Sequence, residues 1–182
     1  MKFKAFLPVA IMIGVVAAVY VFVAQYLEIS ALWVPFISWP LYFIAGAKPS
    51  RLHKEIIGLT GGIIFGFLTL VVVVPMGNIF GAVLSLPLTV FLAAIIIVLL
   101  ELTDWFELAP AYFFSFAGYF AYLFGGFGGA EATNASVIPL FWVLLMVGLG
   151  LGYMTAFLRR KILENQGIFG ADQKTVFDKE RP

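Results

Sequence analysis

The sequence contains no cysteine and a single histidine, His53. Without cysteine the chain has no disulfide, no thiol nucleophile and no thiolate metal site. His53 lies in a short basic segment with no second ligand residue near it, which favours a solvated side chain over a metal centre. The glycine-rich segment 125–129 lacks the flanking strand, helix and lysine of a phosphate-binding loop. We therefore predict a protein that is not an enzyme, with no catalytic residue, no metal and no cofactor.

Charged residues are also scarce. They make up 12% of the 182 residues, whereas 63% are hydrophobic, and an ordinary soluble domain has about a quarter charged residues. Because about 20 apolar residues cross the hydrocarbon core, six spans would occupy most of the chain. We predict an all-α integral membrane protein with the lipid bilayer as a partner, a membrane domain over residues 1–161 and a cytoplasmic tail over 162–182. The net charge of +1 gives no sign of nucleic-acid binding.

Lysine and arginine are absent between Lys54 and Arg159, although the chain has eleven of them. They gather at Lys2 and Lys4, in the segment 48–54, and from Arg159 onwards. Such clusters mark the cytoplasmic flanks of spans. Two apolar segments separate the first two clusters and four separate the last two, so we predict six spans with both ends cytoplasmic. The expected spans are Phe6–Leu27, Ser30–Ala47, Glu55–Val74, Ile79–Leu102, Leu108–Phe124 and Val137–Leu158, with an outer turn over 75–78.

Spans 2 and 5 resemble each other at a constant offset of 77 residues. Each three-span half has an odd number of spans, so the two halves would insert in opposite directions, as in the inverted repeats of many transporters. We predict a 3+3 inverted-topology repeat over residues 6–75 and 79–158, with spans 2 and 5 interrupted by proline. The alternative is chance identity in a chain rich in phenylalanine. The matched residues are Phe36, Ser38, Tyr42 and Phe43 with Phe113, Ser115, Tyr119 and Phe120, and Trp39 aligns with Phe116.

Glycines recur along one face of spans 3 and 6. A spacing of four residues lets another backbone approach closely in a membrane. We predict close helix contacts at these glycines, within one protomer or between protomers of a homo-oligomer. The predicted packing positions are Gly58, Gly62, Gly66, Gly148 and Gly152.

No ionisable residue stands at the centre of a predicted span, which argues against proton coupling and voltage sensing. The polar groups at depth are hydroxyls among aromatic rings, a lining that suits a small uncharged solute. We predict a membrane channel or facilitator for such a solute. The alternatives are a secondary transporter of a small ion or organic solute, and a non-transporting scaffold or partner subunit. The predicted lining residues are Ser38, Trp39, Tyr42, Phe43, Ser115, Phe116, Tyr119 and Phe120.

The second span also carries a resemblance. The segment from Trp33 to Phe43, followed by a basic turn and a glycine-striped span, resembles the YcdZ-type small bacterial inner-membrane proteins, a domain-of-unknown-function family. Pro40 stands where that pattern has a small residue. The resemblance implies a multi-pass protein of a prokaryotic plasma membrane, and it brings no catalytic residues with it.

Overall fold

A computed structural model describes residues 3–168, so Lys2 and most of the predicted tail lie outside the described residues. Within them the chain folds into six α-helices and one short 3₁₀ helix, η1, with no strand. Polar residues and turns separate long apolar segments, each of which satisfies its own backbone hydrogen bonds by forming a helix. The elements are α1 (Phe3–Tyr26), α2 (Pro35–Ile44), η1 (Pro49–Arg51), α3 (Leu52–Phe80), α4 (Ala82–Leu100), α5 (Ala109–Phe124) and α6 (Ile138–Asn165).

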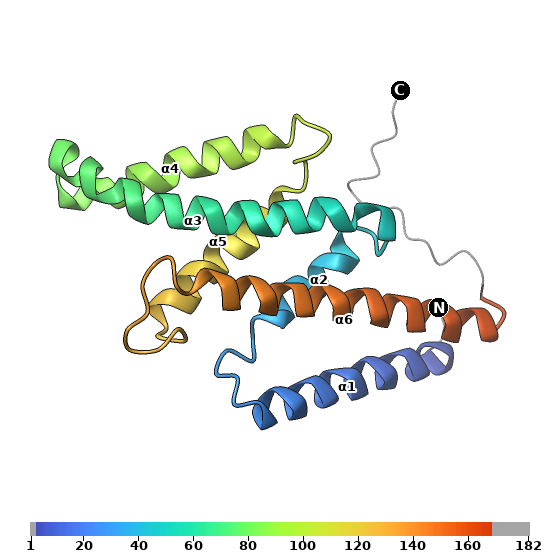
Figure 1. The fold of residues 1–182 in the computed structure, drawn as a ribbon. Coiled ribbons are helices and arrows are strands. Elements are labelled where there is room, and N and C mark those ends of the chain that lie inside the picture. The colour runs from blue at the N-terminus through green and yellow to red at the C-terminus, as the bar shows by residue number, and fades with distance from the viewer. Residues whose placement is uncertain (1–2, 169–182) are drawn as a thin grey trace.

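The four long helices run side by side, and the two short ones cross obliquely between α3 and α6 (Figure 1). The most extensive helix contacts are between α3 and α5 and between α2 and α6. The helix α4 packs mainly on α3, and α1 packs on α6. The fold therefore has a centre of two helix pairs, α2 with α6 and α3 with α5, and one outer helix on each long helix of the centre.

Four helices, α1, α3, α4 and α6, are long and apolar enough to cross a membrane. The protein thus has the helices of a multi-pass membrane protein. In contrast, α2 has 10 residues and α5 has 16, lengths of about 15 and 24 Å, against a hydrocarbon core of about 30 Å. The six full spans predicted from the sequence are therefore not all present as full-length helices.

Proline stands at the beginning of both α2 and α5 and splits neither helix. Pro35 and Pro110 stand at the beginning of α2 and α5, where proline is favoured because the first N–H groups of a helix have no partner. Pro40 lies inside α2, which continues through it. Neither helix is split: α2 begins at Pro35, later than the predicted Ser30, whereas α5 begins at Ala109, next to the predicted Leu108.

The chain before α2 is irregular but its polar groups have partners. The N–H of Ile29 donates to the carbonyl of Ala24 at 2.9 Å. The hydroxyl of Tyr20 donates to the carbonyl of Leu32 at 2.9 Å, and Ala31 and Val34 are buried. Irregular backbone at membrane depth needs such protection by protein. Helix α1 therefore shields the approach to α2.

The turn between α3 and α4 lies later than the sequence predicts. Helix α3 continues through Pro75 to Phe80, and Gly81 alone separates it from α4. The backbone of Gly81 has φ 83° and ψ 156°, a region that is essentially restricted to glycine. The prediction of a turn over 75–78 was wrong, because proline is tolerated in a long membrane helix and only Gly81 adopts the conformation that reverses the chain.

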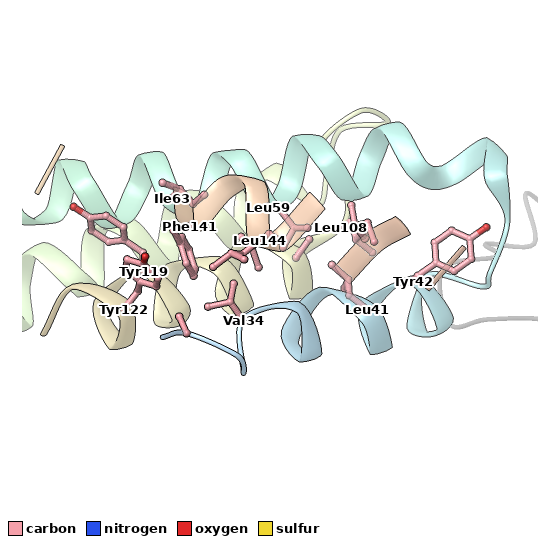
Figure 2. Close-up of a cluster of buried hydrophobic side chains, with 14 of the residues drawn as sticks. Val34, Leu41, Tyr42, Leu59, Ile63, Leu108, Tyr119, Tyr122, Phe141 and Leu144 are labelled. Carbon is pink, nitrogen blue, oxygen red and sulfur yellow. The ribbon is translucent and has the colours of Figure 1, made fainter. Parts of the chain in front are cut away.

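The core lies where the four central helices meet. Leu59 and Ile63 of α3, Leu41 of α2 and Phe141 of α6 are almost fully buried there. Tyr42 lies at one end of this cluster and Tyr119 at the other (Figure 2). The centre is therefore apolar, with tyrosine hydroxyls towards its two ends.

The basic segments meet at one end of the molecule. The beginning of α1, the helix η1 and the end of α6 all lie at the right-hand end in Figure 1. The guanidinium of Arg159 lies 5.8 Å from the centre of the Phe6 ring, which places the first turns of α1 beside Arg159 of α6. We refer to this as the basic end.

We expect that Gly81→Ala lowers the free energy of unfolding by about 1–3 kcal/mol, because alanine is strained at this backbone conformation. Thermal unfolding in detergent measures the effect. Gly77→Ala is the matched control, since a methyl group there makes only ordinary contact with Ser85 at 3.8 Å. An unchanged midpoint for Gly81→Ala would contradict the strained turn.

Candidate functional site

The contact between α2 and α6 is built around Ser38 and Gly148. Ser38 is fully buried, and its hydroxyl donates to the carbonyl of Leu145 on α6 at 2.6 Å. A Cβ atom on Gly148 would collide with this hydroxyl and with the carbonyl of Pro35. Glycine therefore lets α6 approach α2 until a side chain of one helix bonds the backbone of the other.

The contact between α3 and α5 also sets a buried serine against a glycine, but here the serine hydroxyl bonds within its own helix, α5. Ser115 is fully buried, and its hydroxyl donates to the carbonyl of Ala111 at 3.0 Å. A Cβ atom on Gly62 would collide with the Ser115 hydroxyl and the carbonyl of Tyr112. Gly58 faces Ala111 in the same way. Ser38 and Ser115 thus occupy equivalent positions in two separate helix contacts.

A tyrosine follows each serine by one helical turn and packs on the next glycine. Tyr42 covers Gly152, and Tyr119 covers Gly66. The Tyr119 hydroxyl donates to the carbonyl of Asn134 in the loop before α6 at 2.8 Å. Tyr42 lies towards the basic end, with its ring 6.1 Å from that of Tyr153. The two tyrosines therefore point to opposite ends of the bundle.

The other predicted lining residues are aromatic. The indole N–H of Trp39 donates to the hydroxyl of Thr155 on α6 at 2.8 Å. The rings of Phe116 and Phe120 lie 4.8 Å apart, edge to face, and the ring of Phe43 lies 6.3 Å from that of Tyr42. The three phenylalanines are half-buried.

The structure brings the predicted residues together within each helix pair and not across them. Ser38, Trp39 and Tyr42 face α6, whereas Ser115 and Tyr119 face α3. The two pairs meet where Gly118 of α5 approaches Ile37 of α2. In this conformation the Ser38 hydroxyl bonds α2 to α6, the Ser115 hydroxyl bonds within α5, and the two hydroxyls lie in separate helix contacts.

The five predicted packing glycines contact helices of the same chain. Each lies opposite a residue of α5 or α2, as described above for all five. Gly150, in contrast, is exposed and has nothing within 4 Å of its would-be Cβ atom. The glycine stripes therefore serve contacts inside one protomer, and a homo-oligomer stays a prediction.

Sequence reasoning missed Glu55. This residue lies in the first turn of α3, is fully buried, and neither carboxyl oxygen has a hydrogen-bond partner among the described residues. It follows the basic segment 48–54 and is the first residue of the predicted span Glu55–Val74, so it does not stand at a span centre. The available signal was its spacing, because Glu55 precedes Gly58 by three residues and Gly62 by seven and so shares their buried face.

Salt bridges beside Glu55 join η1 and the start of α3 to the loop before α5. The ammonium group of Lys54 lies 2.8 Å from a carboxylate oxygen of Glu107, and the guanidinium of Arg51 lies 3.8 Å from the same oxygen. These contacts fasten the start of α3 to the loop before α5. The exposed ring of His53 packs edge to face on Trp105, with 5.5 Å between ring centres.

The chain belongs to the family described as "Protein of unknown function (DUF1097)", whose model matches residues 10–162. The function of this family is unknown. The sequence resemblance also points to a domain-of-unknown-function family. No curated protein and no solved structure matches the chain.

We expect that Gly62→Leu destabilises the protein by at least about 1–3 kcal/mol, because its side chain must displace the α5 backbone. Gly150→Leu is the matched control on an exposed face, where the same side chain has room. Thermal unfolding and elution volume in detergent compare the two. Equal stability of both variants would show that α3 and α5 do not pack at Gly62.

Proposed function

We propose that this protein is a membrane facilitator for a small uncharged solute, located in a prokaryotic plasma membrane with both chain ends in the cytoplasm. Several apolar helices and a centre made of two similar helix pairs support this function. The solute route would lie near α2 and α5, the short helices between the long ones.

The observation that carries the proposal is the equivalence of the two helix pairs. Gly62 meets Ser115 as Gly148 meets Ser38. Along α3 and α6 a second offset, of 86 residues, relates Gly62 to Gly148. The same offset relates Gly66 to Gly152 and Thr69 to Thr155. The Thr69 hydroxyl donates to the carbonyl of Phe65, and the Thr155 hydroxyl donates to that of Leu151, so the two acceptors are related by this offset as well.

This equivalence supports a 3+3 inverted repeat. In such a repeat α1, α2 and α3 correspond to α4, α5 and α6. The contact of α3 with α5 then corresponds to that of α6 with α2, and the contact of α4 with α3 corresponds to that of α1 with α6. The tyrosines at opposite ends of the bundle agree with the same pseudo-two-fold relation. Transporters of inverted-repeat type bind their substrates near the midplane on short or discontinuous helices, and the proposed repeat would put Ser38 and Ser115 at that depth.

The chemistry of the route is that of exchangeable hydroxyls. The hydroxyls of Ser38 and Ser115 donate to backbone carbonyls in the closed packing. Hydrogen bonds in membranes are worth about 0.6–2 kcal/mol. A polar solute can therefore replace the Leu145 carbonyl at Ser38 when α2 and α6 part, and the Ala111 carbonyl at Ser115 when α3 parts from α5. Aromatic rings on both helices then border the solute, and weak holding favours rapid passage.

A secondary transporter is the second candidate, and Glu55 favours it. A buried carboxyl group beside a helix contact is the kind of group that links solute movement to an ion. The two tightly packed pairs are also suited to rocking against each other, the motion by which inverted-repeat transporters alternate access.

Reporter fusions test the orientation. We expect fusions after Lys54 and Lys161 to report the cytoplasm, because basic flanks stay inside, and fusions at Gly81 and Asn134 to report the outside. A cytoplasmic signal at Asn134 would contradict the topology and the inverted repeat together.

Liposome swelling tests the route. With a panel of small polyols, amides and amines, the double variant Ser38→Ala, Ser115→Ala is expected to change relative swelling rates by about 3- to 30-fold, as loss of hydroxyl contacts of this strength predicts. The control is Ser85→Ala, Thr89→Ala, which removes two buried hydroxyls from α4. Gradient-dependent uptake in place of passive swelling would favour the transporter, and identical rates for both double variants would place the route elsewhere.

A further inference from the structure

Glu55 is a carboxyl group in surroundings that do not stabilise a charge. It is fully buried in the first turn of α3, and neither oxygen has a hydrogen-bond partner among the described residues. An ionised carboxylate in such a place costs far more free energy than a neutral one, so buried charges are paired or neutralised. The question is what neutralises Glu55.

The cations nearest to Glu55 engage another carboxylate. Lys54 and Arg51 both contact Glu107, at 2.8 and 3.8 Å. Arg51, on η1, is close enough for its charge to act on Glu55, and the hydroxyl of Tyr42, on α2, is close enough to be influenced by the charge of Glu55. Neither residue bonds its oxygens.

On the α5 side the titratable neighbour is Tyr112, which packs against Gly58 and Gly61 one to two turns further along α3. On α6, Arg160 acts on Tyr42. None of these groups supplies an ion pair to Glu55. The charge is therefore not neutralised by a side chain of the described protein.

A metal ion does not suit the site. Calcium and magnesium take six or more oxygen ligands, and the described residues contain no group of three histidine or acidic side chains that could hold a metal. Full burial leaves no solvent-filled space at the carboxyl group. A proton is the one cation that needs neither additional ligands nor space.

We propose that Glu55 is a proton-binding site at the basic end of the bundle. In the conformation described, the carboxyl group is neutral and carries a proton between α3 and the helices packed on it. Parting of α3 from α5 exposes the group to water and to the field of Arg51, which favours release of the proton towards the basic end. The proton is thus a second ligand of this protein, separate from the proposed uncharged solute.

Infrared difference spectroscopy of the purified full-length protein in lipid at neutral pH tests the site. We expect the difference between parent and Glu55→Gln to show the loss of one neutral carboxylic-acid band. The matched control is Glu107→Gln, where the salt bridges to Lys54 and Arg51 predict the loss of ionised carboxylate bands. Loss of a carboxylate band in Glu55→Gln would overturn the proposal.

A second measurement needs no variant. A hydrophobic carbodiimide takes up the proton of a neutral carboxyl group and bonds to its oxygen, and the acyl group then migrates to nitrogen, so the whole reagent is added. Mass spectrometry should locate one added reagent on the peptide containing Glu55, with less labelling as the pH rises. Labelling confined to Glu101 and Glu107 would contradict the proton site. Both measurements are independent of solute swelling, so failure of the proton site and of the solute route are distinguishable.

Discussion

At Gly62 and Gly148 two helices approach until no side chain fits between them, and the rest of the arrangement depends on these two contacts. In a bilayer the hydrophobic effect does not drive helices together, so close packing and interhelical hydrogen bonds must do so. The bond from Ser38 to the carbonyl of Leu145 is possible only at this separation. The short helices α2 and α5 are held by these contacts, because neither is long enough to be anchored at both membrane surfaces.

Much of this could be predicted from the sequence because the underlying signals are local and repetitive. The glycine spacing on α3 and α6 identifies a helix face, and the match of Ser38 to Ser115 identifies two residues that occupy equivalent contacts. The basic clusters predict that the beginning of α1, η1 and the end of α6 share one end of the molecule, as they do in Figure 1. Each of these inferences uses the positions of a few residue types along the sequence.

The features that escaped prediction depend on partners distant in the sequence. Proline in the segment 75–78 signals a turn locally, but the chain reverses at Gly81, where backbone freedom is greatest. The late start of α2 depends on cover from α1, supplied by Tyr20. Burial of Glu55 depends on how closely α5 approaches the first turns of α3, and its spacing to Gly58 and Gly62 is the one local sign of it.

The single-residue connection between α3 and α4 also bears on how the chain enters the membrane. Between Glu55 and Glu101 there is no charged side chain, and only Gly81 interrupts the helical backbone. Insertion of this segment into the bilayer therefore exposes no irregular loop and no charged side chain to hydrocarbon. Unpaired peptide groups and charges are the groups whose transfer into hydrocarbon costs the most free energy. The pair α3 and α4 has the properties of a helical hairpin that inserts as one unit during synthesis. It would then offer α5 a glycine-lined surface already at full membrane depth.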